Sequence, residues 1–323
     1  MENHKIRRVL VAVKPFEGES LPAISRARVL AEHLDADIEL VACVSDAGLQ
    51  TGFGADAGPD LASADPATLE VLRTAWRKRA EETLERLAMP LRAIGARVAT
   101  RVCSRRPVYQ GLLELVTETQ ADLLVMGIHE PSPVPHTRLT DTDWQLMRLC
   151  PCPLLLVRDP NLERYAALLA AVDPLRRHAE PLGLDRVVLG AASEIAAAFD
   201  ARLYLVNAYP NPKDYEVVSS VEVEPGVFYG TENFEAAYRR ALDDLIAEAG
   251  IEPDATILRS GAPAAVLLEV AQEQDVDLVV LGALKRSLLE AAILGSTAER
   301  FVADGTSDVL LVKLPHQHLE PSE

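Results

Sequence analysis

The chain repeats itself at an offset of 155 residues, and this duplication restricts its fold more than any other feature of the sequence. One register aligns three pairs of segments: 112–115 with 267–270, 122–127 with 277–282, and 153–158 with 308–313. Farther upstream, residues 33–41 match residues 198–206 after a shift that loop insertions explain. A period of this length is too long for a solenoid and predicts two similar domains.

Within each copy, short strands that are apolar at nearly every position alternate with helical stretches. This alternation is typical of a parallel sheet that is buried on both faces. The predicted strands are 6–13, 37–43, 97–103, 122–127 and 153–157, then 167–172, 202–208, 254–259, 277–282 and 308–312. The predicted helices are 20–34, 67–93, 107–120 and 138–149, then 179–199, 234–249, 263–274 and 295–304. The sequence therefore predicts an α/β fold with two tandem doubly wound domains, each a five-stranded parallel sheet flanked by helices.

The domain boundary is predicted near residue 160, because residues 158–163 have the composition of a short linker. We expect one domain over residues 1–159, a second over residues 160–315, and a mobile tail over residues 316–323. Polar insertions at 44–66 and 209–233 follow the second strand of each copy. Such loops lie at the carboxyl ends of the strands, where open α/β sheets bind their ligands.

The formal net charge is −17, of which −3 falls on residues 1–160 and −14 on residues 161–323. Nucleic acid and anionic lipid surfaces would repel such a chain, so neither is expected as its main partner. No apolar run approaches the roughly 20 residues that a membrane helix needs. Four cysteines in 323 residues do not form a disulfide framework, which favours reduced thiols and a cytoplasmic location.

No metal site is predicted. Cys150 and Cys152 are separated by one residue and have no second pair nearby in the sequence, which is poor spacing for zinc. His129 and His136 lie in a proline-rich stretch and are interpreted as solvent-exposed. Cys43 and Cys103 are expected to pack as small hydrophobic residues at strand ends.

A segment with glycines at its two ends follows the fourth strand of the second copy. It runs from Gly282 to Gly295, after which Ser296 and Thr297 open a predicted helix. Gly295 has no side chain that could obstruct the N-terminus of that helix, and the two hydroxyls add hydrogen-bonding groups there. The helix dipole favours an anion at the same place. Two interpretations remain open from the residues alone: a phosphate site, or a segment that only caps the helix.

This segment resembles the signature of the universal stress protein family, Gly-x2-Gly-x9-Gly-Ser/Thr, which in that family holds the triphosphate and ribose of ATP. Lys285 stands where the signature has its second glycine, so its side chain would either crowd the phosphate path or pair with a phosphate. By the same resemblance, Asp173 and Ala208 match the strand ends that contact the base and ribose, although Asp173 before a proline also fits a turn or a helix cap. The nucleotide site implied by the resemblance comprises Ala171, Val172, Asp173, Ala208, Gly282, Leu284, Lys285, Gly295, Ser296 and Thr297.

The first copy departs from that signature. Glu130 and Asp141 would place carboxylates where a nucleotide carries its phosphates, and like charges at such distances repel strongly. Lys14 also stands at the position that corresponds to Asp173. We therefore expect the first copy not to bind ATP through this motif.

Residues 139–157 are similar to the Thr-Asp-Trp-x-Leu-Leu-Arg-x-Cys-Pro signature of the tandem, UspE-type branch of the same family. Thr140 or Asp141 is interpreted as a helix cap and Trp144 as a side chain that faces the core. Domains of this family, whose fold is adenine nucleotide α-hydrolase-like, pair through their last strands. The resemblance thus implies an internal pseudo-dimer with residues 154–157 and 309–312 at its seam.

The resemblance implies a stress-response binding or signalling module that takes ATP, ADP or AMP in its second domain, with Mg²⁺ as a companion ion of ATP. An unidentified protein partner and a homodimer of tandem chains are compatible with this function. Two alternatives stay open: a module for another anionic ligand or a protein contact, and a slow ATP hydrolase. No catalytic residue is predicted, since the sequence contains neither a nucleophile elbow nor a Walker A motif.

Overall fold

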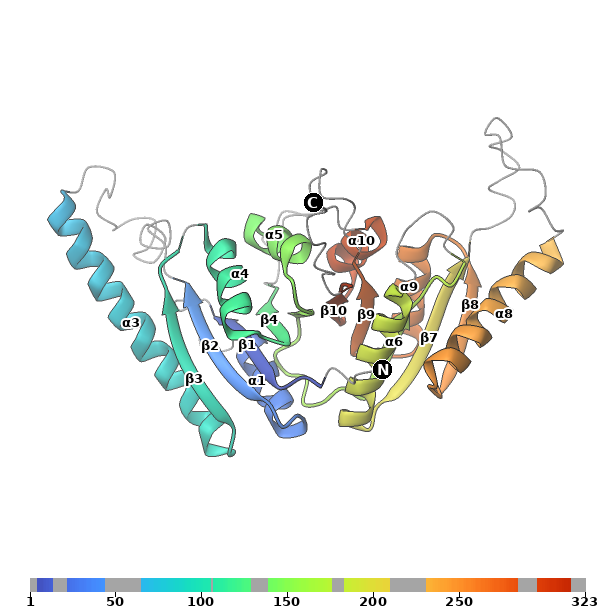
Figure 1. Ribbon diagram of the computed structural model, residues 1–323, viewed down its shortest axis with the longest axis horizontal. Helices are drawn as coiled ribbons and strands as arrows, with labels where there is room; N and C mark the ends of the chain where they lie inside the picture. The colour runs from blue at the N-terminus through green and yellow to red at the C-terminus, as the bar shows by residue number, and fades with distance from the viewer. Residues whose placement is uncertain are drawn as a thin grey trace, which may run out of the picture. The chain divides into compact units, whose positions relative to one another are not determined.

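The computed structural model describes residues 5–13, 22–43, 65–105, 107–128, 139–175, 183–209, 231–283 and 295–314. Its residues group into two compact units that divide between Arg164 and Tyr165, and each unit is an α/β layer described by itself below (Figure 1). Within the described ranges, no helix combines the length and the apolar character that a membrane crossing requires.

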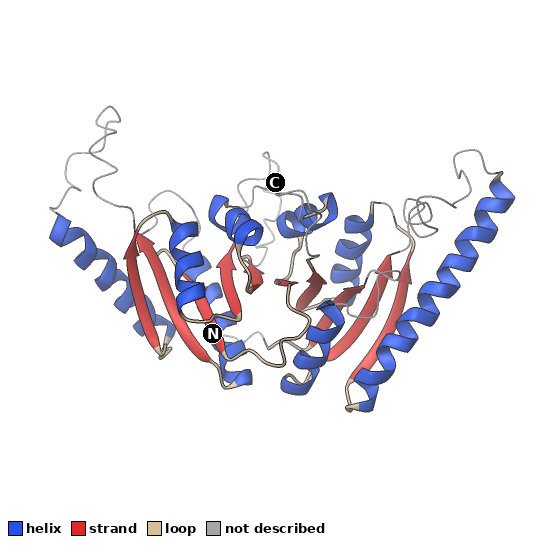
Figure 2. Ribbon diagram, turned by 180° about the vertical axis from the view of Figure 1, so that it is seen from behind, coloured by secondary structure: helices blue, strands red, loops and turns tan. Residues whose placement is uncertain are grey.

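The first unit is a parallel sheet of strand order β3-β2-β1-β4-β5, with helices packed on both faces (Figure 2). Its strands are β1 (Arg8–Val13), β2 (Asp37–Cys43), β3 (Arg97–Cys103), β4 (Leu123–Gly127) and β5 (Leu154–Val157). Its helices are α1 (Pro22–His33), α3 (Pro66–Ala93), α4 (Val108–Thr119) and α5 (Asp141–Leu149). Helix α1 packs with α3, and α4 packs with α5, so two layers of helices enclose the sheet.

The second unit repeats this arrangement with the order β10-β9-β6-β7-β8, again parallel throughout. Its strands are β6 (Ala167–Ala171), β7 (Arg202–Tyr209), β8 (Ala255–Ser260), β9 (Leu278–Gly282) and β10 (Asp308–Val312). Its helices are α6 (Leu184–Phe199), α8 (Thr231–Ala249), α9 (Pro263–Glu273) and α10 (Ser296–Asp304). Helix α6 packs with α8, and α9 packs with α10.

The predicted fold class is confirmed, and the central strands show why the pattern was informative. Every residue of β5 and of β10 is buried, as are the first four of β4 and of β9. A strand that is covered on both faces must be apolar at consecutive positions rather than at alternate ones. Helix starts follow the prolines closely: Pro263 is the first residue of α9, whereas Pro107 is the N-cap of α4.

One aspartate in each unit ties the start of the fourth strand to the start of the first strand. The Oδ2 atom of Asp122 accepts hydrogen bonds from the backbone amides of residues 7–8, both at 2.9 Å. In the second unit, Oδ2 of Asp277 accepts from the amides of residues 166–167 at 2.6 and 3.0 Å. The repeated aspartate at the head of the matching segments is therefore a structural residue.

Residues 159–162, near the end of the first unit, are held by its helix α1. The guanidinium of Arg26, which is 1% exposed, donates to the carbonyl oxygens of Asp159 at 3.1 Å and Leu162 at 3.2 Å. The Ser25 hydroxyl donates to the carbonyl oxygen of Pro160. These bonds satisfy carbonyls of an irregular segment that would otherwise need water, and they fix its path over the first unit.

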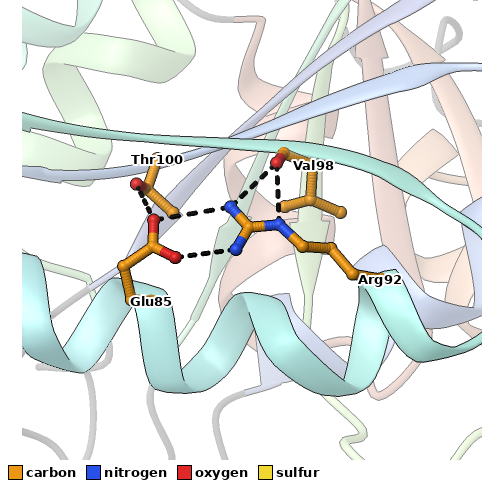
Figure 3. Close-up of polar contacts among 4 residues, drawn as sticks. All are labelled: Glu85, Arg92, Val98 and Thr100. Atoms are coloured by element: carbon orange, nitrogen blue, oxygen red, sulfur yellow. Dashed lines mark hydrogen bonds and ion pairs between the residues drawn. The ribbon is translucent and has the colours of Figure 1, made fainter.

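A polar cluster fastens the long helix α3 to strand β3 (Figure 3). The Glu85 carboxylate accepts hydrogen bonds from Arg92 at 2.7 Å and from the Thr100 hydroxyl at 2.6 Å. Arg92 also donates to the carbonyl oxygen of Val98 from two of its nitrogens, at 3.0 and 3.1 Å. The hydrogen bonds from Arg92 and Thr100 lower the pKa of Glu85 from its ordinary 4.5 to about 2.

This lowered pKa predicts an acid-sensitive contribution to stability from Glu85. Because the folded pKa lies below the unfolded one, the contribution is complete above about pH 4.5 and is lost as the pH falls towards 2. Replacing Glu85 with glutamine should therefore lower the melting temperature at pH 7 and have a vanishing effect near pH 2. Thermal unfolding over pH 2 to 7 measures this, with Glu81→Gln, an exposed carboxylate on the same helix, as control. Equal effects of the two variants at pH 7 would contradict the prediction.

Candidate functional site

The predicted site residues of the second unit gather at the carboxyl edge of its sheet. Strands β9, β6 and β7 are neighbours and parallel, so their ends at Gly282, Ala171 and Ala208 lie at the same edge. Helix α10 connects β9 to the parallel strand β10, which brings its N-terminus at Ser296 back to that edge as well. Leu284 and Lys285 lie outside the described residues.

Asp173 follows strand β6 and is exposed, while Val172 before it is buried. The backbone amide of Asp173 donates to Oδ1 of Asp185, in the first turn of α6, at 3.1 Å. The N-cap of α6 is Gly183, so Asp173 is not the cap of that helix. This interaction fixes the backbone after β6 and leaves Asp173 at the edge where the other predicted residues lie.

Asn207 is a buried polar residue beside the candidate site that the sequence analysis did not single out. It is 1% exposed, and its Nδ2 donates to the carbonyl oxygen of Val172 at 2.8 Å. Its Oδ1 has no hydrogen-bond partner within the described residues. Strands β1 and β2 of the first unit pair as β6 and β7 do in the second, and in this register Ala42 occupies the position that corresponds to Asn207. The signal was available, because Asn207 is a polar residue that interrupts a run of apolar ones in β7.

The N-terminus of α10 has no side-chain cap among the described residues. Its N-cap is Gly295, with φ −63° and ψ 140°, and apart from its chain neighbours no described residue has an atom within 4 Å of the place where a side chain would begin. Ser296 is exposed and Thr297 half-buried at the first two helical positions. The amides of a first turn lack partners within the helix, so this end offers donors and a partial positive charge to an anion.

The corresponding helix end in the first unit is closed by its own side chains. Thr140 is the N-cap of α5, and its hydroxyl accepts from the amide of Asp143 at 3.3 Å. The Asp143 carboxylate, 3% exposed, accepts in return from the Thr140 amide at 2.7 Å. This capping box confirms Thr140 as the cap, whereas no described side chain caps the helix that begins after Gly295.

Trp144, interpreted from the sequence as a core-facing side chain, is not fully buried. Its side chain is only half-buried and lies 5.8 Å from the guanidinium of Arg148. The buried residues of α5 are Asp143, Leu146 and Met147. The capping aspartate thus takes one of the buried positions of this short helix.

Gly282 has a packing neighbour that the sequence did not indicate. A side chain there would begin 2.7 Å from the side chain of Leu184, the first residue of α6. At the equivalent Gly127 a side chain would begin 3.6 Å from Pro22, an ordinary contact distance, so the close approach is particular to Gly282. The absence of a side chain at Gly282 therefore makes room for a helix of the protein.

The described residues contain no group of three or more His, Cys, Asp or Glu side chains arranged to hold a metal ion. Cys150 and Cys152 do approach each other, with 3.6 Å between their sulfur atoms, and both are buried.

Comparisons with known proteins agree with this architecture. The model of the "Universal stress protein family" matches residues 5–158 and 169–313. Universal stress protein E of Escherichia coli (strain K12) is 24% identical over 316 residues, which cover 98% of this chain and 96% of that protein. A Universal stress protein E homolog of Haemophilus influenzae is 29% identical over 205 residues, 62% of this chain and 64% of the other.

Solved structures share the tandem fold over nearly the whole chain. A putative universal stress protein from Pseudomonas aeruginosa UCBPP-PA14 superposes with a TM-score of 0.70 at 24% identity, covering 96% of this chain and 94% of that one. A universal stress protein from Archaeoglobus fulgidus gives a TM-score of 0.63 at 14% identity, covering 97% and 99%. At these identities the likeness establishes the fold.

Proposed function

The chain belongs to the universal stress protein family, and from this membership we propose that its second unit binds an adenine nucleotide and that the first unit does not. The observation that carries the proposal is the difference between two equivalent helix ends. Helix α10 has Gly295 as its N-cap and no side-chain cap among the described residues, whereas α5 is closed by Thr140 and Asp143. An open helix N-terminus is a ready site for a phosphate group.

In this proposal the phosphates lie at the amides and hydroxyls of Ser296 and Thr297, with Lys285 as a charge partner. Asp173, two residues after β6, and Ala208, the second-last residue of β7, contact the ribose and base, as the resemblance implies. Ala171, Val172, Gly282, Leu284 and Gly295 complete the backbone around the nucleotide. Mg²⁺ would accompany ATP, since it neutralises polyphosphate charge.

The biological role that we propose is a cytoplasmic stress-response module that reports nucleotide binding through a contact with another protein. Anionic partners such as nucleic acid or acidic lipid remain disfavoured by the net charge of −17. Catalysis is not part of the proposal.

The test is titration calorimetry of the full chain with ATP, ADP and AMP up to millimolar concentration, with inorganic pyrophosphate as a separate titrant. We expect one nucleotide per chain. Binding of pyrophosphate without any nucleotide would favour the alternative of another anionic ligand, and no binding of either would refute an anion site. Phosphate release above that of a Ser296→Ala variant would instead indicate a hydrolase.

A further inference from the structure

Two cysteines end adjacent strands of the first unit, at the carboxyl edge of the sheet. Cys43 is the last residue of β2 and Cys103 the last of β3, and the two are register partners in this parallel pair. Register partners on neighbouring strands project to the same face, and the strands lie about 4.8 Å apart. That spacing falls within the roughly 4.4 to 6.8 Å between Cα atoms that a disulfide spans.

The two thiols already interact, and the surrounding chain leaves room for them. Each of the Cys43 and Cys103 thiols is the largest influence on the pKa of the other. Gly111 of helix α4 lies next to Cys103. A side chain at Gly111 would begin 2.6 Å from the Cys103 sulfur and 2.9 Å from Cβ of Arg105, so glycine leaves the space that the sulfur occupies. Cys103 is 8% exposed and Cys43 is partly exposed, so a small reagent reaches the pair from the Cys43 side.

The electrostatic surroundings favour one thiolate beside one thiol. The pKa of Cys103 is lowered to about 6, mainly by the hydrogen bond from Cys43 and further by the backbone amide and charge of Arg105, while burial and Glu114 oppose this. The pKa of Cys43 is raised by its hydrogen bond to Cys103 and by burial. A thiolate is the nucleophilic form of cysteine, and a second thiol in contact can resolve its oxidised product.

We propose that Cys43 and Cys103 form a reversible oxidation site that takes a small hydroperoxide and closes a disulfide. The Cys103 thiolate attacks the peroxide oxygen, the O–O bond breaks, and the leaving alkoxide or hydroxide takes a proton from solvent. The sulfur of Cys43 then attacks the sulfur of the Cys103 sulfenic acid and the S–O bond breaks. The hydroxide released from Cys103 takes up the thiol proton of Cys43 and leaves as water. Two thiols are thereby oxidised and one peroxide is reduced, to an alcohol and water, or to two waters from hydrogen peroxide.

The other cysteine pair provides an internal comparison. Cys150 and Cys152 have their sulfur atoms 3.6 Å apart, but they are two residues apart on one segment and Cys150 is 1% exposed. The hydrogen bond to Cys150 and burial raise the pKa of Cys152. A buried pair of this kind reacts slowly with a peroxide in water.

The second unit carries no equivalent pair. At the positions of Cys43 and Cys103 it has the register partners Ala208 and Arg259. The dithiol therefore occupies, in the first unit, the edge where the second unit has its proposed nucleotide site. The test of the proposed oxidation site does not depend on whether the second unit binds a nucleotide.

The experiment exposes the reduced full chain to equimolar hydrogen peroxide, blocks free thiols with N-ethylmaleimide, and maps the peptides under non-reducing conditions. We expect one cross-linked peptide pair that joins Cys43 to Cys103, lighter by two hydrogens than the two free peptides, with Cys150 and Cys152 still alkylated. Dithiothreitol should restore both thiols. In Cys43→Ser, dimedone should trap the unresolved sulfenic acid on Cys103.

The double variant Cys150→Ser, Cys152→Ser is the matched control and should form the same cross-link. Recovery of Cys43 and Cys103 fully alkylated after peroxide would overturn the proposal, and so would a cross-link that joins only Cys150 and Cys152. Because the peptide map is made on the unaltered chain, it shows whether Cys43 and Cys103 form the disulfide even if a cysteine variant fails to fold.

Discussion

Replacing Ser296 with aspartate is expected to abolish nucleotide binding while leaving the protein folded. The new carboxylate would stand at the first position of α10, where the proposed phosphate lies, and two like charges about 4 Å apart repel by roughly 4 kcal/mol at an effective dielectric of 20. A repulsion of about 3 to 4 kcal/mol weakens binding by more than a hundredfold. Aspartate in a first helical turn stabilises the helix, so the loss cannot be attributed to unfolding.

The first unit supplies the precedent and the matched control for this variant. Asp141 is the first residue of α5, the position in the first unit that corresponds to Ser296. The change Asp141→Ser should leave the affinity of the full chain unaltered, because α5 keeps its own cap. Calorimetry with ATP measures both variants, and thermal unfolding checks their folding. An unchanged affinity in Ser296→Asp would show that the nucleotide binds elsewhere or not at all.

Replacing Asp277 with alanine is expected to give the largest loss of stability among these variants. The change removes the acceptor for the amides of residues 166–167, at the entrance to β6, the central strand of the second unit. Each hydrogen bond to a charged group contributes about 1.5 to 3 kcal/mol, and partial exposure of the carboxylate to water reduces that gain. We expect the free energy of unfolding of the second unit to fall by about 2 to 3 kcal/mol.

Urea denaturation monitored by circular dichroism measures this loss. Asp277→Asn keeps one carbonyl oxygen as an acceptor and should cost less than half as much. Asp122→Ala removes the equivalent bonds in the first unit and should lower the stability of that unit instead. If Asp277→Ala unfolds at the same urea concentration as the unaltered protein, the carboxylate is not the structural tie that its geometry indicates.

Much of the fold was predictable because its signals are local or repeated. The ends of β2, β3 and β10 match their predicted limits. The offset of 155 residues places Gly295 and Thr140 at equivalent positions, and both are N-caps in the structure. Helix α6 differs most, since it begins at Leu184 and not at residue 179, and residues 176–182 lie outside the described part of the chain.

The site was less predictable because its character depends on contacts between distant segments. Gly282 matches the signature, but only the packing of α6 shows that Leu184 takes the space it leaves. Asn207 could be seen as a polar residue in an apolar strand, but its bond to Val172 required the pairing of β7 with β6. Cys43 and Cys103 were interpreted as separate hydrophobic residues because 59 positions lie between them in the chain.

The sequence by itself determined the duplication, the parallel α/β layers and the place of the helix N-terminus at Gly295, because periodicity, glycine and proline act on the backbone within a few residues. Only the tertiary structure decided that α5 is closed while α10 has no side-chain cap among the described residues, and that two thiols meet at the end of β2 and β3. Hydrogen bonds and sulfur contacts depend on distances in space. The register of neighbouring strands and the approach of helices set those distances, and neither can be read from one segment alone.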